Sequence, residues 1–289
     1  MHRLIVATWI VLFAAVAQAA PPYRVLIVDG QNNHAWKATT PVLTKHLTDS
    51  GLFKVEVATS PEKGKDMSGF TPKFADYQAV ISNYNGDEWS EPTKQSLVDY
   101  VGKGGALVII HAANNSFPKW TAYNEMIGLG GWGGRNEKSG PYVRFRDGQI
   151  VKDTQPGPGG HHGKQHPFQV IVRNSQHPIT AGMPTAWMHA NDELYDKLRG
   201  PAENIDVLAT AYADPATGGS GEHEPMIFTV KFGQGRVFHS PMGHSVEAME
   251  CAGFALTLTR GTEWAITGQV TQTKLPEDFP TADKVSVRK

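Results

Sequence analysis

Three histidines occupy positions from which they can act together in chemistry. His34, His111 and His244 each follow an apolar segment within a few residues. A neutral imidazole can accept a proton, donate a hydrogen bond or bind a borderline metal ion such as zinc. Because the carboxyl ends of parallel strands meet at one edge of a sheet, we expect these imidazoles to converge. We predict that His111 and His244 are catalytic and that His34 contacts the substrate.

Two adjacent acids, Asp192 and Glu193, are the carboxylates best suited to assist these histidines. A carboxylate can act as a general base or hold an imidazole in one orientation. We therefore predict catalytic roles for both acids and a substrate contact for the nearby Tyr195. A salt bridge at the end of a strand or helix is the structural alternative for the pair.

Amide and aromatic side chains in the neighbouring loops suit the recognition of a sugar. Amides bind hydroxyl groups, and a flat indole packs against the C–H face of a sugar ring. Most of the seven tryptophans are expected to fill the core instead. Beside His34 and Tyr195, the predicted substrate-binding residues are Asn33, Trp36, Asn85, Asn114 and Trp132.

The densest histidine cluster runs from His161 to His166 and follows a Gly-Pro-Gly-Gly segment. Neutral imidazoles are good ligands for divalent metals, so His162 and His166 are the candidate ligands of a divalent metal cofactor. No helical spacing holds them in register, and a lid that forms hydrogen bonds or a solvated loop is the alternative.

Continuous apolar runs in the first half predict strands that are buried on both faces, which is typical of parallel sheets. Helical patterns separate these runs, with one helix starting near Thr39-Thr40-Pro41 and another spanning residues 91–102. The order predicts an open α/β sheet with right-handed crossovers. The predicted strands cover residues 23–30, 53–58, 78–84 and 106–110.

The second half begins with a glycine-rich region over residues 128–163. We predict a helix over residues 249–259 that buries Cys251, and a loosely held tail over residues 274–289. The predicted strands cover residues 142–145, 168–172, 207–211, 226–230 and 236–239, with one more starting at Glu193.

The N-terminus and the composition bear on location and partners. Residues 1–19 combine a basic start, an apolar run and an Ala-Gln-Ala end, which is typical of a cleaved secretory signal peptide. A retained N-terminal anchor is the alternative. We expect an exported protein, periplasmic or secreted, with one domain over residues 20–273 and no stable membrane insertion after cleavage. A net charge of −1 argues against nucleic-acid binding, and a single cysteine excludes an intrachain disulfide.

Together these segments resemble the ThuA-like (trehalose utilisation) family of the class I glutamine amidotransferase-like superfamily. The resemblance spans residues 24 to about 262 and depends on the order of several short motifs. They are the loop from Gly30 to Trp36, Gly104-Gly105 with the strand ending at His111, His177-Pro178-Ile179, Asp192-Glu193-Leu194-Tyr195, and Gly233 to Phe238 running on to Gly243-His244.

The resemblance implies a flavodoxin-like, open, mostly parallel sheet with helices on both faces. It also implies a role in carbohydrate metabolism, on disaccharides or glycosides, including their 3-keto forms. In amidotransferases the nucleophile occupies the turn where this chain has His111, so glutaminase chemistry lacks its cysteine. The predicted signal peptide and the insert near residues 156–166 depart from the family pattern. Both favour a role on periplasmic glycosides over a cytoplasmic role.

We therefore predict an enzyme that acts on a small-molecule carbohydrate. In a 3-keto glycoside the carbonyl acidifies the proton at C2, so His111 or Glu193 can remove it while His244, His34 or a metal stabilises the enolate oxygen. Elimination of the alcohol and addition of water then complete net hydrolysis. A non-catalytic carbohydrate-binding protein is the second hypothesis, and the sequence leaves the oligomeric state open.

Overall fold

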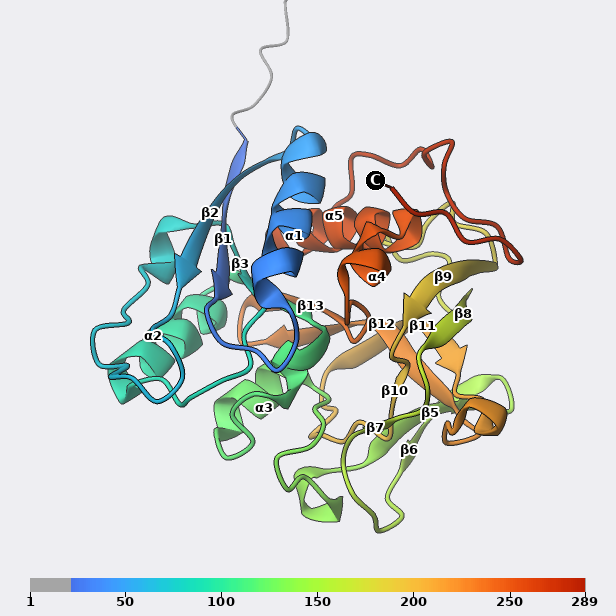
Figure 1. The fold of residues 1–289 in the computed structure, drawn as a ribbon, viewed down its shortest axis with the longest axis horizontal. Coiled ribbons are helices and arrows are strands. Elements are labelled where there is room, and N and C mark those ends of the chain that lie inside the picture. Colours follow the sequence, from blue (N-terminus) through green and yellow to red (C-terminus); the bar gives the residue numbers. More distant parts are fainter. Residues whose placement is uncertain (1–21, 289) are drawn as a thin grey trace, which may run out of the picture.

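One half of the main sheet is parallel, and four of its five strands come from the first 110 residues. The computed structural model describes residues 22–288 and is shown in Figure 1. Five strands pair in parallel in the order β2-β1-β3-β4-β13. They are β1 (Tyr23–Asp29), β2 (Phe53–Thr59), β3 (Ala79–Ser82), β4 (Ala106–Ile110) and β13 (Gly235–Ser240).

Helices cover both faces of this half because its strands are apolar on both sides. In β1, Val25 and Ile27 pack into one core cluster, whereas Leu26 and Val28 pack into the other. One face carries α1 (Trp36–Asp49), α4 (Val246–Glu250) and α5 (Ala252–Thr267). The other carries α2 (Glu91–Gly102) and α3 (Thr121–Ile127). The predicted α/β class and flavodoxin-like arrangement are confirmed.

The sheet continues beyond β13 as an antiparallel half, in the order β13-β12-β11-β8-β9. A tight turn at Gly233-Gln234 joins β12 to β13. These strands are β12 (His223–Phe232), β11 (Ile205–Tyr212), β8 (His166–Val172) and β9 (Ala186–Asp192). β5 (Tyr142–Arg146) joins β12 and β6 (Gln149–Asp153), while β7 (His161–His162) pairs with β10 (Tyr195–Asp196) in a separate small sheet.

Short 3-10 helices complete the described fold, and one of them carries a candidate residue. That segment, η2 (His111–Asn115), follows β4 directly. The others are η1 (Phe74–Asp76), η3 (Glu137–Ser139) and η4 (Pro215–Thr217).

Three predicted boundaries are wrong. α1 starts at Trp36, so Pro41 lies within the helix rather than in its first turn. The predicted helix over residues 249–259 is two helices, because the backbone leaves the helical region at Cys251 (ψ 124°). The strand expected to start at Glu193 starts two residues later, as the short β10, and β9 ends just before it at Asp192.

The C-terminal segment is held in place, contrary to the expected loose tail. The Met188 N–H donates to Thr281 O at 2.8 Å, and the Ala252 N–H donates to Ser286 O at 2.9 Å. The Phe279 ring packs against the buried Trp187. The predicted signal peptide lies outside the described residues, and within residues 22–288 no helix has the length and apolarity of a membrane span.

Candidate active site: three histidines and a glutamate

The three strand-end histidines meet at the carboxyl edge of the parallel half. His34 lies in the loop after β1, His111 begins η2 after β4, and His244 follows β13. The ring centroids of His34 lie 4.7 Å from His111 and 4.6 Å from His244. The structure therefore places residues that are 210 positions apart in the sequence in direct contact.

Glu193 lies at the centre of this group, although it comes from the antiparallel half. Its Oε2 atom is 3.0 Å from His244 Nδ1, 3.5 Å from His34 Nε2 and 3.6 Å from His111 Nε2. One ligand atom from each of the four side chains lies within 4.8 Å of the other three. We call these four residues the His/Glu cluster.

The carboxylate and the imidazoles shift one another's protonation. Burial alone raises the pKa of Glu193, but the contacts with His111, His244 and His34 outweigh it and hold that pKa well below its usual range. Burial lowers the pKa of His34 despite its contact with Glu193. The contact with Glu193 raises the pKa of His244. The cluster therefore keeps one negative charge at the centre of the imidazoles.

In His111 and His34, the ring nitrogen that points away from Glu193, Nδ1, lies close to an oxygen acceptor. His111 Nδ1 lies 2.7 Å from the carbonyl oxygen of Pro241, which accepts only from an N–H. His34 Nδ1 lies 3.2 Å from Asn32 Oδ1. In the neutral form of either ring, Nε2 then carries the lone pair and faces Glu193. Carbonyl partners of this kind typically orient histidine ligands of metals.

Two buried nitrogens of the cluster make no hydrogen bond. These are His111 Nε2 and His244 Nδ1, and both face the Glu193 carboxylate. A buried polar atom without a partner costs about 1–3 kcal/mol, so such atoms call for an explanation. The Gln165 side-chain amide contacts the other nitrogen of His244 at 3.0 Å. The Gln165 Nε2–H group donates to this nitrogen, so in the neutral ring the proton lies on Nδ1 and faces Glu193, and a bound metal would displace it.

The spacing of these atoms fits a metal coordination sphere. Two ligands bound at about 2.1 Å to a tetrahedral zinc ion lie about 3.4 Å apart. The separations of 3.0, 3.5 and 3.6 Å from Glu193 Oε2 bracket that value. Three imidazole nitrogens and one carboxylate oxygen form a donor set suited to zinc and its first-row neighbours. The four residues therefore fit a divalent metal.

His111 also departs from ordinary backbone geometry. Its φ is 45°, in the left-handed region that non-glycine residues adopt infrequently. This sharp turn directly after β4 directs the ring to the sheet edge, as the corresponding turn does for nucleophiles in related architectures. Here the turn presents an imidazole, which agrees with the absence of cysteine or serine at this position.

Asp192 supports the cluster from behind and does not line the cleft. Its fully buried carboxylate accepts the backbone N–H groups of Glu193 at 2.8 Å, Gly243 at 2.7 Å and His244 at 3.0 Å. His189 Nε2 lies 2.8 Å from Asp192 Oδ2. Although burial opposes a charge on either group, the pair raises the pKa of His189 to about 9 and lowers that of Asp192. Asp192, predicted to be catalytic, thus lies where it can position the Glu193 and His244 backbones, with its carboxylate outside the cleft.

A cleft of about 580 Å³ opens over the cluster. Trp132 and Tyr195 form one wall, with ring centroids 4.6 Å apart, and Tyr195 packs on His111 at 4.1 Å. Of the residues predicted to bind substrate, those that line the cleft are Asn33, His34, Asn85, Trp132 and Tyr195.

Two predicted substrate residues lie elsewhere. Asn114 is fully buried, and its amide contacts His239 Nε2 at 3.1 Å, because η2 turns it into the core. Its neighbour Asn115 lines the cleft instead. Trp36 lines an adjoining cavity.

The histidine-rich segment is divided between the cleft and the surface. His162 lines the cleft with Nε2 3.7 Å from Glu193 Oε1, while its Nδ1 lies 2.8 Å from the Gly163 carbonyl oxygen. His166 Nδ1 faces the Lys164 carbonyl oxygen, and its ring packs near Phe168. His166 lies outside the four-residue donor set, and so does His162. The donor set thus differs from the predicted ligands, His162 and His166. These two residues lie on different strands, β7 and β8, and their rings do not come together.

Sequence reasoning missed Gln165 and His189, which contact His244 and Asp192. Gln165 lies within the histidine-rich segment, so its position was the only signal in the sequence. His189 lies in β9 among apolar residues and gives no signal of its own.

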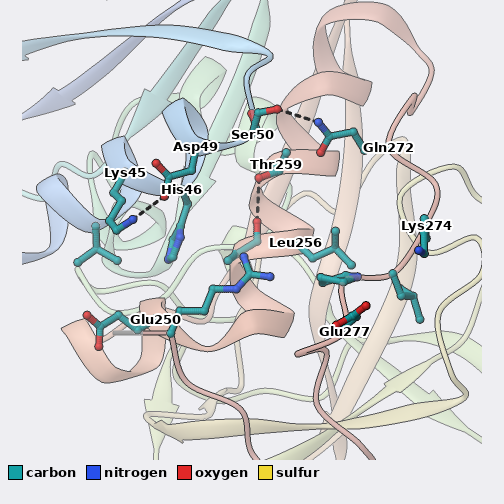
Figure 2. A pocket seen from close by; sticks show the side chains of 15 residues that line it. Lys45, His46, Asp49, Ser50, Glu250, Leu256, Thr259, Gln272, Lys274 and Glu277 are labelled. Atoms are coloured by element: carbon teal, nitrogen blue, oxygen red, sulfur yellow. Dashed lines mark hydrogen bonds and ion pairs between the residues drawn. The ribbon is translucent and has the colours of Figure 1, made fainter.

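A larger cavity, of about 690 Å³, lies away from this cleft between α1, α5 and the C-terminal segment (Figure 2). Lys45, His46, Asp49 and Glu250 are among its lining residues. No member of the His/Glu cluster lines it.

Comparisons with known proteins agree with this architecture. The sequence profile of the family described as "ThuA: Trehalose utilisation" matches residues 24–265. A ThuA-like protein of known structure from Parabacteroides merdae is 51% identical, with 93% of this chain and 98% of that chain covered and a TM-score of 0.90. A ThuA-like protein from Bacteroides uniformis is 17% identical over 90% of this chain and 97% of its own, with a TM-score of 0.59, and shares the fold. No functionally curated protein matches the sequence. On the profile match and the 51% identical relative, this chain belongs to the ThuA family, whose description is trehalose utilisation.

Proposed function

We propose that this protein is a metal-dependent enzyme that cleaves glycosides in their 3-keto form. The observation that carries the proposal is the His/Glu cluster, where two buried imidazole nitrogens face one carboxylate without hydrogen bonds. His34, His111, Glu193 and His244 would hold a divalent cation, which would satisfy these nitrogens and offset the carboxylate charge. When bound, such an ion supplies Lewis-acid stabilisation of the negative charge that develops on a keto oxygen.

Metal ligation leaves His162 as the base nearest to the cluster. Its Nδ1–H donates to the Gly163 carbonyl oxygen, so Nε2 carries a lone pair directed at the cleft. His162 Nε2 takes the proton from C2 of the 3-keto sugar, the C1–O bond breaks, and the leaving alkoxide takes that proton back from His162. Water then adds across the resulting C1–C2 double bond, which gives the free keto sugar.

The remaining cleft residues suit the binding of a sugar ring. Asn33, Asn85 and Asn115 offer amide donors and acceptors to hydroxyl groups. The Trp132 ring offers an apolar face to the C–H groups of the ring. This lining supports a carbohydrate rather than a lipid or a nucleic acid, in keeping with the trehalose utilisation description of the family.

Export is part of the proposal and stands on residues 1–19 alone. Their signal-peptide pattern favours a periplasmic or secreted enzyme. Fractionation of cells that express the full chain, with N-terminal sequencing of the recovered protein, tests it. Full-length protein in the cytoplasm would contradict export.

The test of function combines metal analysis with turnover. Protein purified without chelators should carry about one divalent metal per chain and should hydrolyse p-nitrophenyl 3-keto-glucoside. Removal of the metal should abolish release of nitrophenol, and its return should restore it. The matched variants are His111→Ala, in the donor set, and His166→Ala, outside it. Metal-free protein that hydrolyses the substrate at the full rate would overturn the proposal.

A non-catalytic sugar-binding protein is the second candidate, because amides and an indole line the cleft. His162→Ala separates the two functions. An enzyme loses turnover in this variant and keeps most of its affinity, whereas a binding protein has no turnover to lose.

A further inference from the structure

A second cavity adjoins the cleft over the His/Glu cluster. It has a volume of about 530 Å³ and lies between the loop after β1 and the loops after β2 and β3. The two spaces share Asn33 and Asn85, whose side chains join through a 2.7 Å hydrogen bond from Asn85 Nδ2 to Asn33 Oδ1. A ligand that passes this amide pair would occupy both spaces at once.

The floor of this cavity is held by the buried side chain of Gln31. Its Nε2 donates to Pro61 O at 2.8 Å, and its Oε1 accepts from the Asp87 N–H at 2.9 Å. Gly86 packs so closely that a Cβ there would lie 2.4 Å from the Gln31 side chain. Three loops are thereby fixed to one another, so the cavity is preorganised before any ligand binds.

The lining of this cavity selects for a polyhydroxylated ligand. Trp36 is its one large apolar side chain, and the Lys37 ammonium lies 5.4 Å from the centre of that ring. Lys37 and Lys63 are balanced by Glu62 and Asp87, so the lining carries no strong preference for an ionic ligand. An indole face among amides and charged groups suits a sugar ring better than an alkyl chain.

We propose that this adjoining cavity is the leaving-group subsite and that it accepts a second sugar ring. The keto sugar then lies over the His/Glu cluster, the glycosidic bond lies beside Asn33 and Asn85, and the departing sugar lies against Trp36. This assignment rests on the proposed function. It makes Trp36 a specificity-determining residue, remote from the atoms that react.

The test compares two substrates, the 3-keto forms of methyl glucoside and of a glucosyl disaccharide. The wild type should prefer the disaccharide in kcat/KM, and Trp36→Ala should reduce that preference about 10-fold, which equals about 1.4 kcal/mol. Trp36→Phe should retain most of the preference because it keeps an aromatic face. Trp264→Phe, in a separate cavity, is the matched control and should keep the wild-type ratio.

Several outcomes would overturn the subsite. One is equal kcat/KM for the two substrates in the wild type, and another is an unchanged ratio in Trp36→Ala. If neither substrate is turned over, the proposed function fails, and calorimetry with the same two compounds still decides the subsite. Tighter binding of the disaccharide that is lost in Trp36→Ala supports it, whereas equal affinities contradict it.

Discussion

The α1/α5 cavity and the cleft over the His/Glu cluster differ in how the histidines and charged groups that line them are satisfied. In the α1/α5 cavity, Lys45 Nζ lies 2.5 Å from Asp49 Oδ2, and His46 Nε2 lies 2.9 Å from the carbonyl oxygen of Met249 (Figure 2). Arg288 pairs with Asp278 through two contacts of 2.7 and 2.8 Å. In the His/Glu cleft, by contrast, His111 Nε2 and His244 Nδ1 are buried without hydrogen bonds.

This difference teaches that volume alone does not identify a reactive site. The α1/α5 cavity is larger, at about 690 Å³ against 580 Å³. Lys45, Asp49, His46 and Arg288 of its lining have partners within the protein and gain little from a ligand. The cluster holds two imidazole nitrogens without hydrogen bonds around one carboxylate, and this costs stability unless a cation completes it.

The largest effect is expected from loss of the central carboxylate. Glu193→Gln keeps the shape of the side chain and removes its charge, so it should abolish stoichiometric metal and reduce turnover at least about 100-fold. Metal analysis by mass spectrometry and steady-state kinetics measure both quantities. Wild-type metal content in Glu193→Gln would contradict the claim that the cleft over the His/Glu cluster, unlike the α1/α5 cavity, needs a cation.

A smaller effect is expected from the residue behind the cluster. Asp192→Asn weakens the anchor of the Glu193 and His244 backbones and leaves His189 without its charged partner. We expect metal affinity to fall about 10- to 100-fold. Excess metal should restore turnover in Asp192→Asn if the variant is folded. A misfolded variant would stay inactive at any metal concentration. Failure to recover activity in a folded variant, as judged by circular dichroism, contradicts the positioning role.

The acid stability of the fold should depend on His239, which is fully buried in β13. Its Nδ1 contacts the Ile127 carbonyl oxygen at 2.8 Å, and its Nε2 faces the Asn114 amide. Burial lowers the pKa of His239 to about 3. The unfolded state therefore binds the proton more tightly, and stability falls as the pH drops from about 6.5 towards 3. The loss should reach about 2 kcal/mol between pH 6.5 and 5.

Urea unfolding of metal-free protein at these two pH values measures that loss. His239→Gln keeps a donor and an acceptor but does not titrate, so its stability should depend less on pH. An identical pH dependence in the wild type and in His239→Gln would show that other groups cause the loss.

The smallest effects are expected in the α1/α5 cavity. Lys45→Ala removes an exposed ion pair, and Glu250→Gln is the matched control for Glu193→Gln. Each should change the free energy of unfolding by less than about 1 kcal/mol and turnover by less than about twofold. A large loss of turnover in either variant would show that this cavity also serves the reaction.

Much of the fold was predictable because the parallel half depends on local patterns. Non-alternating runs such as Ala106–Ile110 are apolar on both faces, and only a strand covered on both sides satisfies them. The convergence of His34, His111 and His244 follows from the same topology, since parallel strands end at one edge. The placement of Glu193 next to them does not follow, because it depends on pairings within the antiparallel half.

Prediction of individual roles failed where neighbouring residues point in opposite directions. Asn114 and Asn115 are adjacent, yet η2 buries the first and leaves the second in the cleft. Asp192 and Glu193 diverge in the same way at the end of β9, where one faces backbone amides and the other faces imidazoles. Residue type and spacing do not encode these directions.

The sequence by itself determined the α/β class, the parallel strands and the set of histidines at their ends, because hydrophobic periodicity and strand order are local properties of the chain. Only the tertiary structure decided that Glu193 joins three of those histidines, that His166 does not, and that Asp192 lies behind them. The physical reason is that a donor set depends on distances of 3 to 4 Å between side chains from separate elements. Such distances are set by the packing of the two halves of the sheet.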